Sequence, residues 1–292
     1  MVKDKKEKYD ICQGFVLEKE AESNPYIWNL RHKMPQKILF LLFFLSLFGS
    51  RTTALYSQQN LEFHRGAIIR GDTARNQLAL VFTGHEFAEG GQEIMKTLEQ
   101  QDSKASFFFT GHFYRNPAFS DLIASLVEEG HYLGAHSDKH LLYCDWSKRD
   151  SLLVNRAEFT KDLLDNYKEM EKFGVKKEDV PFFLPPYEWY NDSISAWTRN
   201  LDLQLINFTH GTLSHADYTT PSMPGYRSSR TIYESILTYE KAHPSGLNGF
   251  ILLVHIGAGP GREDKFYLML DELMKELKKM DYQFVRIDEL LK

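Results

Sequence analysis

Cysteine is scarce in this chain, and its scarcity excludes a fold that depends on disulfide bonds. Only Cys12 and Cys144 occur among the 292 residues. Cys12 precedes the segment that we interpret below as an export signal, so the mature part keeps Cys144 alone and forms no internal disulfide. Stability must then come from a hydrophobic core, which a chain with 42% hydrophobic residues can build.

Three other features are missing. The formal net charge is −5 and the pI is about 6.1, so there is no basic surface to attract nucleic acid. A glycine-rich phosphate motif does not follow the first expected strand, which argues against a nucleotide-binding fold. No apolar run reaches the roughly twenty residues that a membrane-spanning helix needs. No obligate protein partner is evident from the sequence.

The N-terminal region has the pattern of an export signal. Lys37 precedes the uncharged run Ile38–Phe48, and small residues follow at Thr52 and Ala54. We therefore divide the chain into a polar extension (1–33), a signal peptide or signal-anchor (34–54), a linker (55–75) and one domain (76–292). Either the true start is Met34, or residues 1–33 are a short cytoplasmic tail. Both accounts predict a periplasmic, cell-surface or extracellular protein with no other membrane segment.

Short apolar runs alternate with helical patterns along the domain. The expected strands are 78–83, 105–110, 131–136, 182–184, 203–209, 250–255 and 283–287. The expected helices cover about 91–101, 117–129, 158–172, 191–200, 230–242 and 264–280. Such alternation indicates a parallel α/β sheet, and seven units in this length favour a distorted (β/α)7 barrel of the TIM type as a single domain.

Polar residues gather where these strands end. His85 and Glu86 follow the first strand, His136 closes the third, and His255 ends the sixth. In barrels of this kind the active site lies at the carboxyl ends of the strands. A long loop, residues 210–229, would lie over the same face and help to shape a substrate groove.

His136 and His140 are the strongest candidates for metal ligands. They are four residues apart in the run His136-Ser137-Asp138-Lys139-His140. If a helical turn begins after the strand, both imidazoles face the same way and can bind one ion.

At these residues the sequence resembles the polysaccharide deacetylases with a NodB-homology domain, carbohydrate esterase family four. The run from His136 to His140 matches the His-Ser/Thr-x-x-His motif of that family. Pro185-Pro186-Tyr187 matches most of the motif after the fourth strand, and Leu253-Val254-His255 matches the Leu-x-His motif near the end. The resemblance covers roughly residues 76–290 and implies a hydrolase that removes N- or O-acetyl groups from a polysaccharide or oligosaccharide.

Two positions depart from the family pattern. His85 and Glu86 stand where the family has two aspartates, and Leu184 stands where it has an arginine. We align Glu86 with the carboxylate ligand, which completes a His-His-carboxylate site with open positions for water and substrate. His85 then falls at the position of the catalytic base, and an imidazole can accept a proton at neutral pH. Asp138 is a second candidate base.

The resemblance also implies roles on the substrate side. The backbone N–H of Tyr187 would help to hold the oxyanion, and His255 would act as general acid. Pro186, Glu188 and Trp189 are the expected substrate-binding residues. Zn²⁺ is the cofactor that suits two imidazoles and a carboxylate best, and Co²⁺ or Ni²⁺ also fit.

Two other functions are compatible with parts of this pattern. A non-catalytic glycan-binding barrel derived from a deacetylase would explain the missing aspartates and arginine. A glycosidase using two carboxylates such as Glu86 and Glu188 would leave the histidines unexplained. In the favoured interpretation the partner is an acetylated glycan.

Overall fold

The computed structural model describes residues 60–292. The polar extension and the predicted export signal lie outside the described residues, as does Cys12. Within the described part, no helix is both long and apolar enough to cross a membrane. Cys144 is fully buried there.

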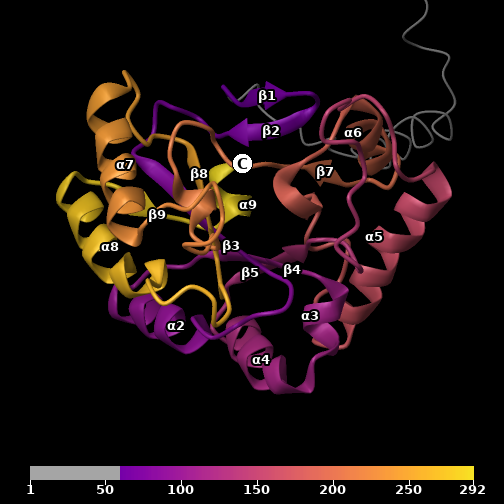
Figure 1. Ribbon diagram of the computed structural model, residues 1–292, viewed down its shortest axis with the longest axis horizontal. Helices are drawn as coiled ribbons and strands as arrows, with labels where there is room; N and C mark the ends of the chain where they lie inside the picture. Colours follow the sequence, from indigo (N-terminus) through magenta and orange to yellow (C-terminus); the bar gives the residue numbers. More distant parts are fainter. Residues whose placement is uncertain (1–59) are drawn as a thin grey trace, which may run out of the picture. The chain divides into compact units, whose positions relative to one another are not determined.

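A curled, mostly parallel sheet forms the centre of the molecule, with helices packed around its outer side (Figure 1). The strand order is β1-β2-β8-β3-β4-β5-β6-β7, and β9 pairs with β3 off this path. The strands are β1 (Glu62–His64), β2 (Ala67–Arg70), β3 (Gln77–Gly84), β4 (Ser106–Phe109), β5 (Tyr132–Ala135), β6 (Phe182–Phe183), β7 (Gln204–Leu205), β8 (Phe250–His255) and β9 (Gln283–Phe284). All seven expected strands are present, and the expected distorted α/β barrel is confirmed.

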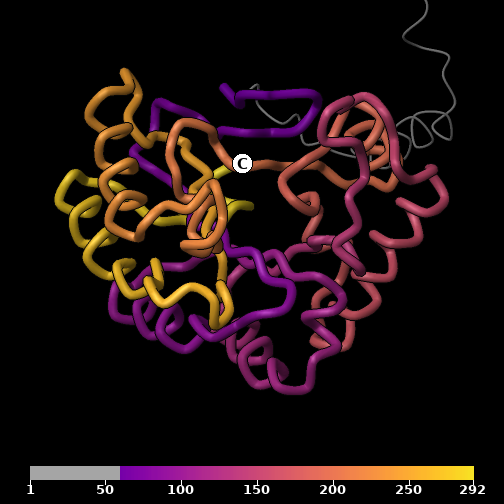
Figure 2. Tube along the Cα trace, viewed as in Figure 1, coloured from indigo at the N-terminus to yellow at the C-terminus, as the bar shows by residue number. Residues whose placement is uncertain are grey.

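The curl brings the chain just after β7 back to β2. Ile206 forms an isolated parallel bridge with Ile68, and the N–H of Asn207 donates to the carbonyl of Ile68 at 2.9 Å. On the other side, β2 pairs antiparallel with β8. The tube trace shows this indigo hairpin running beside the orange segment that follows β7 (Figure 2).

The N-terminal hairpin is the main departure from the expected domain plan. Residues 55–75 were expected as a linker, yet β2 lies inside them and is wholly buried. Its short apolar run ends in Arg70, a residue that is 3% exposed. The guanidinium of Arg70 donates to the carbonyls of Asn248 and Gly246. A buried charge satisfied by distant carbonyls has no local sequence signal.

The last expected strand is shorter than predicted. β9 ends at Phe284 and pairs only with the start of β3, because the chain turns into α9 (Ile287–Leu290). The N–H of Ile287 donates to the hydroxyl of Ser106 at 2.8 Å, which fixes the beginning of that helix against β4.

The expected helices are confirmed. Most of their ends shift by one to three residues, but the last helix begins at Leu270 and not at about residue 264. The helices are α2 (Gly91–Gln100), α4 (Ser120–Glu128), α5 (Arg156–Glu171), α6 (Asp192–Arg199), α7 (Ser229–Ala242) and α8 (Leu270–Lys279), while the short α3 (Gly111–Arg115) was not expected. Asparagine side chains accept hydrogen bonds from the backbone N–H groups in the first turn of two of these helices. Asn155 caps α5 within a capping box, and Asn191 caps α6.

Strands buried on both faces hold the frame rigid. Phe107, Phe108 and Phe109 of β4 are fully buried, as are Leu252 and Leu253 of β8. Burying one such side chain stabilises the fold by ~1.5–3 kcal/mol, so the strand ends are fixed by many independent contributions. Functional groups placed at those ends therefore start from a well-defined scaffold.

Candidate metal and acid–base site

Strand register brings the predicted site residues to one edge of the sheet. Gly84 pairs with Phe109, Phe109 with Ala135, and Ala135 with Phe183. On the other side of β3, Thr83 pairs with His255. Because the residues that follow these paired positions leave the sheet at one level, His85, His136 and the turn after β6 emerge beside His255.

His136 and His140 lie together, but a tight turn and not a helix places them. Their ring centroids are 5.1 Å apart. Ser137 and His140 have positive φ values of 70° and 56°, and the Ser137 hydroxyl accepts the N–H of His140 at 3.0 Å. The expected helical turn is therefore wrong. The two imidazoles nevertheless lie side by side, and their role as metal ligands stays a prediction.

The orientation of His136 suits a metal ligand. Its Nδ1 lies 2.8 Å from the carbonyl oxygen of Leu184, and its backbone N–H donates to Asn166 Oδ1 at 2.8 Å. A carbonyl oxygen only accepts, so Nδ1 carries the proton and Nε2 keeps its lone pair. Leu184 stands where the family has an arginine, and here it contributes through its backbone.

Burial keeps both imidazoles neutral. It lowers the pKa of His136 to about 3 and that of His140 to about 2. A histidine must be unprotonated to bind a metal ion. The donor chemistry of this pair therefore fits a divalent cation at neutral pH.

His85 and His112 join His136 and His140 in what we call the histidine cluster. The His85 ring stacks on that of His140 at 4.8 Å and lies 5.1 Å from that of His112, which belongs to α3. Its Nδ1 is 3.0 Å from the hydroxyl of Thr110, which can accept from or donate to the ring and so accommodates either tautomer. Burial, followed by the charge of His112, lowers the pKa of His85.

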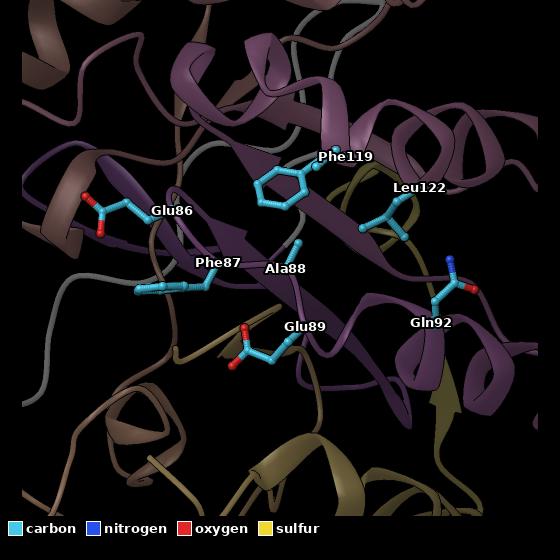
Figure 3. Close-up of a pocket in the computed structure, with 8 residues that line it drawn as sticks. Glu86, Phe87, Ala88, Glu89, Gln92, Phe119 and Leu122 are labelled. Atoms are coloured by element: carbon cyan, nitrogen blue, oxygen red, sulfur yellow. The ribbon is translucent and has the colours of Figure 1, made fainter. Parts of the chain in front are cut away.

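Glu86 lies at the rim of this cluster. Its side chain is 61% exposed, and its Oε1 is 4.0 Å from Nε2 of His85. It also lines one end of a pocket of about 410 Å³, where it points away from Gln92 and Leu122 (Figure 3). Within residues 60–292, no three His, Cys, Asp or Glu side chains converge closely enough to hold a metal. The structure brings together the two histidines, and Glu86 as third ligand stays a prediction.

Asp138, the second candidate base, is engaged elsewhere. It is 4% exposed, and its Oδ1 is 2.5 Å from Nη1 of Arg115. Arg115 also lies 3.6 Å from Glu169 of α5, so this pair ties α3 and the His136–His140 turn to α5. A carboxylate held in this way positions the turn.

His255 pairs with Thr83 at the end of β3, and its charge adds to the effect of burial in lowering the pKa values of His136 and His140. It has a carboxylate partner that was not assigned from the sequence. Oδ1 of Asp217 lies 2.6 Å from Nδ1 of His255, and Oδ2 accepts the His255 N–H at 2.8 Å. Burial lowers the pKa of His255, but Asp217 and Glu188 outweigh it, and the net shift is upward. Asp217 comes from the loop 210–229, where only its place in a long loop pointed to function.

The turn after β6 is strained. Tyr187 and Glu188 both have positive φ values, 59° and 53°, which is costly for residues other than glycine. The Tyr187 ring is 4.3 Å from that of His140. Burial raises the pKa of Glu188 to about 7 against the opposing effect of His255. Pro186 is buried beneath this turn.

Comparison with known proteins agrees with this geometry. A model of the family "polysaccharide deacetylase" matches residues 70–206. The peptidoglycan-N-acetylglucosamine deacetylase of Bacillus cereus is 29% identical, over 68% of this chain and 81% of the relative. The peptidoglycan-N-acetylmuramic acid deacetylase PdaA of Bacillus subtilis is 24% identical, over 77% of this chain and 75% of the relative. Over residues 70–206 the chain matches the polysaccharide deacetylase family, and peptidoglycan deacetylases are among its relatives.

Solved structures show the same fold. The structure of PdaA superimposes with a TM-score of 0.60 at 22% identity, covering 77% of this chain and 85% of that one. A family-four pseudoenzyme from Bacillus anthracis gives a TM-score of 0.61 at 19% identity, covering 79% of this chain and 70% of that one. A mutant of this pseudoenzyme has also been solved, and its enzymatic activity is restored.

Proposed function

We propose that this protein is a metal-dependent hydrolase that removes acetyl groups from a glycan of the peptidoglycan or chitin type. The observation that carries the proposal is the Asp217–His255 pair, which lies at the same strand ends as the two neutral imidazoles of His136 and His140. The names of the relatives, which include peptidoglycan and chitin deacetylases, support the substrate class.

His136 and His140 would hold the ion, with Glu86 as the third ligand after its exposed side chain turns inward. Zn²⁺ suits this donor set, and Co²⁺ or Ni²⁺ could replace it. When bound, such an ion would polarise the acetyl carbonyl and lower the pKa of water.

His85 would accept a proton from the attacking water. Its lowered pKa keeps it unprotonated at neutral pH, and Thr110 holds its ring through Nδ1. The stacking of His85 on His140 places this base beside the ligand pair.

His255 would donate the proton that the leaving nitrogen or oxygen needs. Its Nδ1 is held by Asp217, so Nε2 is the atom free to exchange a proton with substrate. A raised pKa keeps more of this residue protonated near neutral pH, as a general acid requires. The Tyr187 N–H would stabilise the developing oxyanion.

The substrate also implies a location outside the cytoplasm. A glycan of this type lies beyond the cell membrane, and the pattern of residues 34–54 favours export. We therefore propose a periplasmic, cell-surface or extracellular protein.

Acetate release from acetylated chitin and peptidoglycan oligosaccharides tests the proposal. We expect release by the zinc-loaded protein, loss of release with a chelator, and none from His136→Ala. Metal binding without acetate release from either substrate would contradict it.

That outcome would favour a non-catalytic glycan-binding barrel. One observation supports this second candidate: no group of three metal ligands is preformed within residues 60–292.

A further inference from the structure

Exposed aromatic rings lead away from the histidine cluster. Tyr187, whose ring lies 4.3 Å from that of His140, meets Trp146 at 5.6 Å and a 77° angle. Trp146 in turn lies 5.4 Å from Trp189. Trp146 is 55% exposed and Tyr187 is 42% exposed. Two large rings that meet almost at a right angle form an apolar corner, of a kind that marks a binding site on a soluble protein.

Arg149 stacks on Trp189, the ring that contacts Trp146, and its charge has no acidic partner among the described residues. Its guanidinium carbon is 4.1 Å from the centre of the Trp189 ring, and its Nε donates to the carbonyl of Tyr190 at 2.6 Å. Among residues 60–292, no carboxylate lies within ion-pairing distance of Arg149. The nearby Asp150 and Asp192 both pair with Arg65, at 2.9 and 2.8 Å.

The surroundings make this lone charge costly. Burial and the positive charge of Arg65 lower the pKa of Arg149, which still remains protonated. The neighbouring imidazoles of His64 and His210 have pKa values lowered by burial and then by nearby charges that include Arg149. A bound carboxylate would relieve the cost of an unpaired, half-buried cation, and its two oxygens match the two terminal nitrogens of a guanidinium.

We propose that Trp146, Tyr187 and Arg149 form a subsite for a carboxylate-bearing sugar, next to the sugar whose acetyl group reaches the histidines. This inference rests on the proposed function and makes its substrate more specific: an acidic glycan is preferred over a neutral one. Trp146 and Tyr187 would contact the apolar faces of the sugar rings, and Arg149 would bind the acid.

A structural role for Arg149 is the alternative. Its contact with Trp189 and its bond to Tyr190 could simply hold the loop that carries Trp146 against the turn after β6. The two roles differ in their consequences, because a structural arginine would affect acidic and neutral glycans alike.

Binding titrations with the full chain distinguish the two roles. The probes are a tetrasaccharide of alternating N-acetylglucosamine and N-acetylmuramic acid, its methyl ester, and fully N-acetylated chitotetraose, which is neutral. We expect the acidic tetrasaccharide to bind about tenfold more tightly than the other two, because a hydrogen bond to a charged group contributes ~1.5–3 kcal/mol and 1.4 kcal/mol is tenfold.

Variants assign the preference to the subsite. Arg149→Gln should remove the roughly tenfold preference and leave the affinity for chitotetraose within about twofold, while Arg149→Lys retains part of it. Trp146→Ala should weaken the binding of the acidic tetrasaccharide and of chitotetraose alike. Arg230→Gln is the matched control, since Arg230 is an exposed arginine that pairs with Glu234 on α7. It should change neither affinity.

Equal affinity for the acid and its ester, or an equal loss for both glycans in Arg149→Gln, would overturn the subsite. The melting temperature of each variant identifies a loss that reflects unfolding. Binding is measured apart from acetate release, so the two proposals fail separately. A carboxylate preference without acetate release would refute only the activity, and acetate release without the preference would refute only the subsite.

Discussion

The site has two parts: the Asp217–His255 pair, called here the acid side, and the proposed metal ligands His136, His140 and Glu86, called the metal side. They differ in how firmly the fold holds their side chains in place. On the acid side, Asp217 holds His255 through both its ring and its backbone N–H, and the carboxylate is almost fully buried. On the metal side, His136 and His140 are fixed, but Glu86 remains 61% exposed. Burial with fixed partners defines a side chain before any ligand arrives, whereas an exposed carboxylate must be ordered by the ion it binds.

Removing the ion should have the largest effect. Chelation, or His140→Ala, should reduce acetate release by on the order of a thousandfold, because a Lewis acid contributes several kcal/mol to the transition state. Inductively coupled plasma analysis should find about one zinc per chain in the wild type and almost none in His140→Ala. Undiminished release by the metal-free protein would show that the histidine pair does not act through an ion.

Asp217→Asn should reduce acetate release by roughly a hundredfold at neutral pH, at the lower end of the usual contribution of general acid–base catalysis, because His255 itself remains. In Asp217→Asn the pKa of His255 should fall, so the alkaline limb of the kcat profile moves to lower pH. Asp271→Asn, at an exposed ion pair on α8, should leave the profile in place. An unmoved alkaline limb in Asp217→Asn would separate His255 from the proton transfer.

The Asp217–His255 pair also predicts the direction in which the free energy of unfolding changes with pH. The pKa of His255 is raised in the folded state, so its contribution is complete below the unfolded value near 6.5 and is lost as pH rises through the folded value. The difference in unfolding free energy between wild type and Asp217→Asn should therefore narrow at alkaline pH. Chemical denaturation between pH 5 and 9 measures it, and a constant difference would contradict the shift.

Two neighbouring glutamates allow a direct test of the metal side. Glu86→Gln should weaken zinc affinity by at least about tenfold, since it removes a charged ligand. Glu89→Gln is the matched control: Glu89 accepts the N–H groups of Ala258 and Gly259 and pairs with Lys265, so it is occupied away from the histidines. Equal zinc affinities for the two variants would remove Glu86 from the ligand set.

The smallest effect concerns the positioning of His136. Asn166→Ala removes the acceptor of its backbone N–H and should lower the free energy of unfolding by ~1–3 kcal/mol. Zinc affinity should fall only a few-fold, because Leu184 still orients the ring. A loss of affinity as large as in His140→Ala would mean that Asn166 does more than position the turn.

The sequence predicts this fold well where a local pattern reflects the packing. Apolar runs such as Phe107–Phe109 identify strands buried on both faces, and polar residues mark where those strands end. β2 could not be predicted in this way because its apolar run is short. Its last residue, Arg70, is charged, and its guanidinium donates to carbonyls about 180 residues away.

The site divides in the same way. His136, His140 and His255 follow strands, so their positions could be predicted. The partners of His136 and His255, Asn166 and Asp217, come from a helix and a loop that meet the site only in three dimensions, at no fixed spacing. The same holds for Arg115, which pairs with Asp138 of the His136–His140 turn. The turn between His136 and His140 depends on two positive φ values, which residue types other than glycine rarely reveal.

The central claim is that one divalent ion binds at the His136–His140 pair with Glu86. An anomalous-diffraction map of zinc-loaded crystals tests it most directly. We expect a single strong peak about 2.1 Å from Nε2 of His136 and from a ring nitrogen of His140, with a Glu86 oxygen at a similar distance. A peak at any other residues, or none at full zinc loading, would contradict the claim.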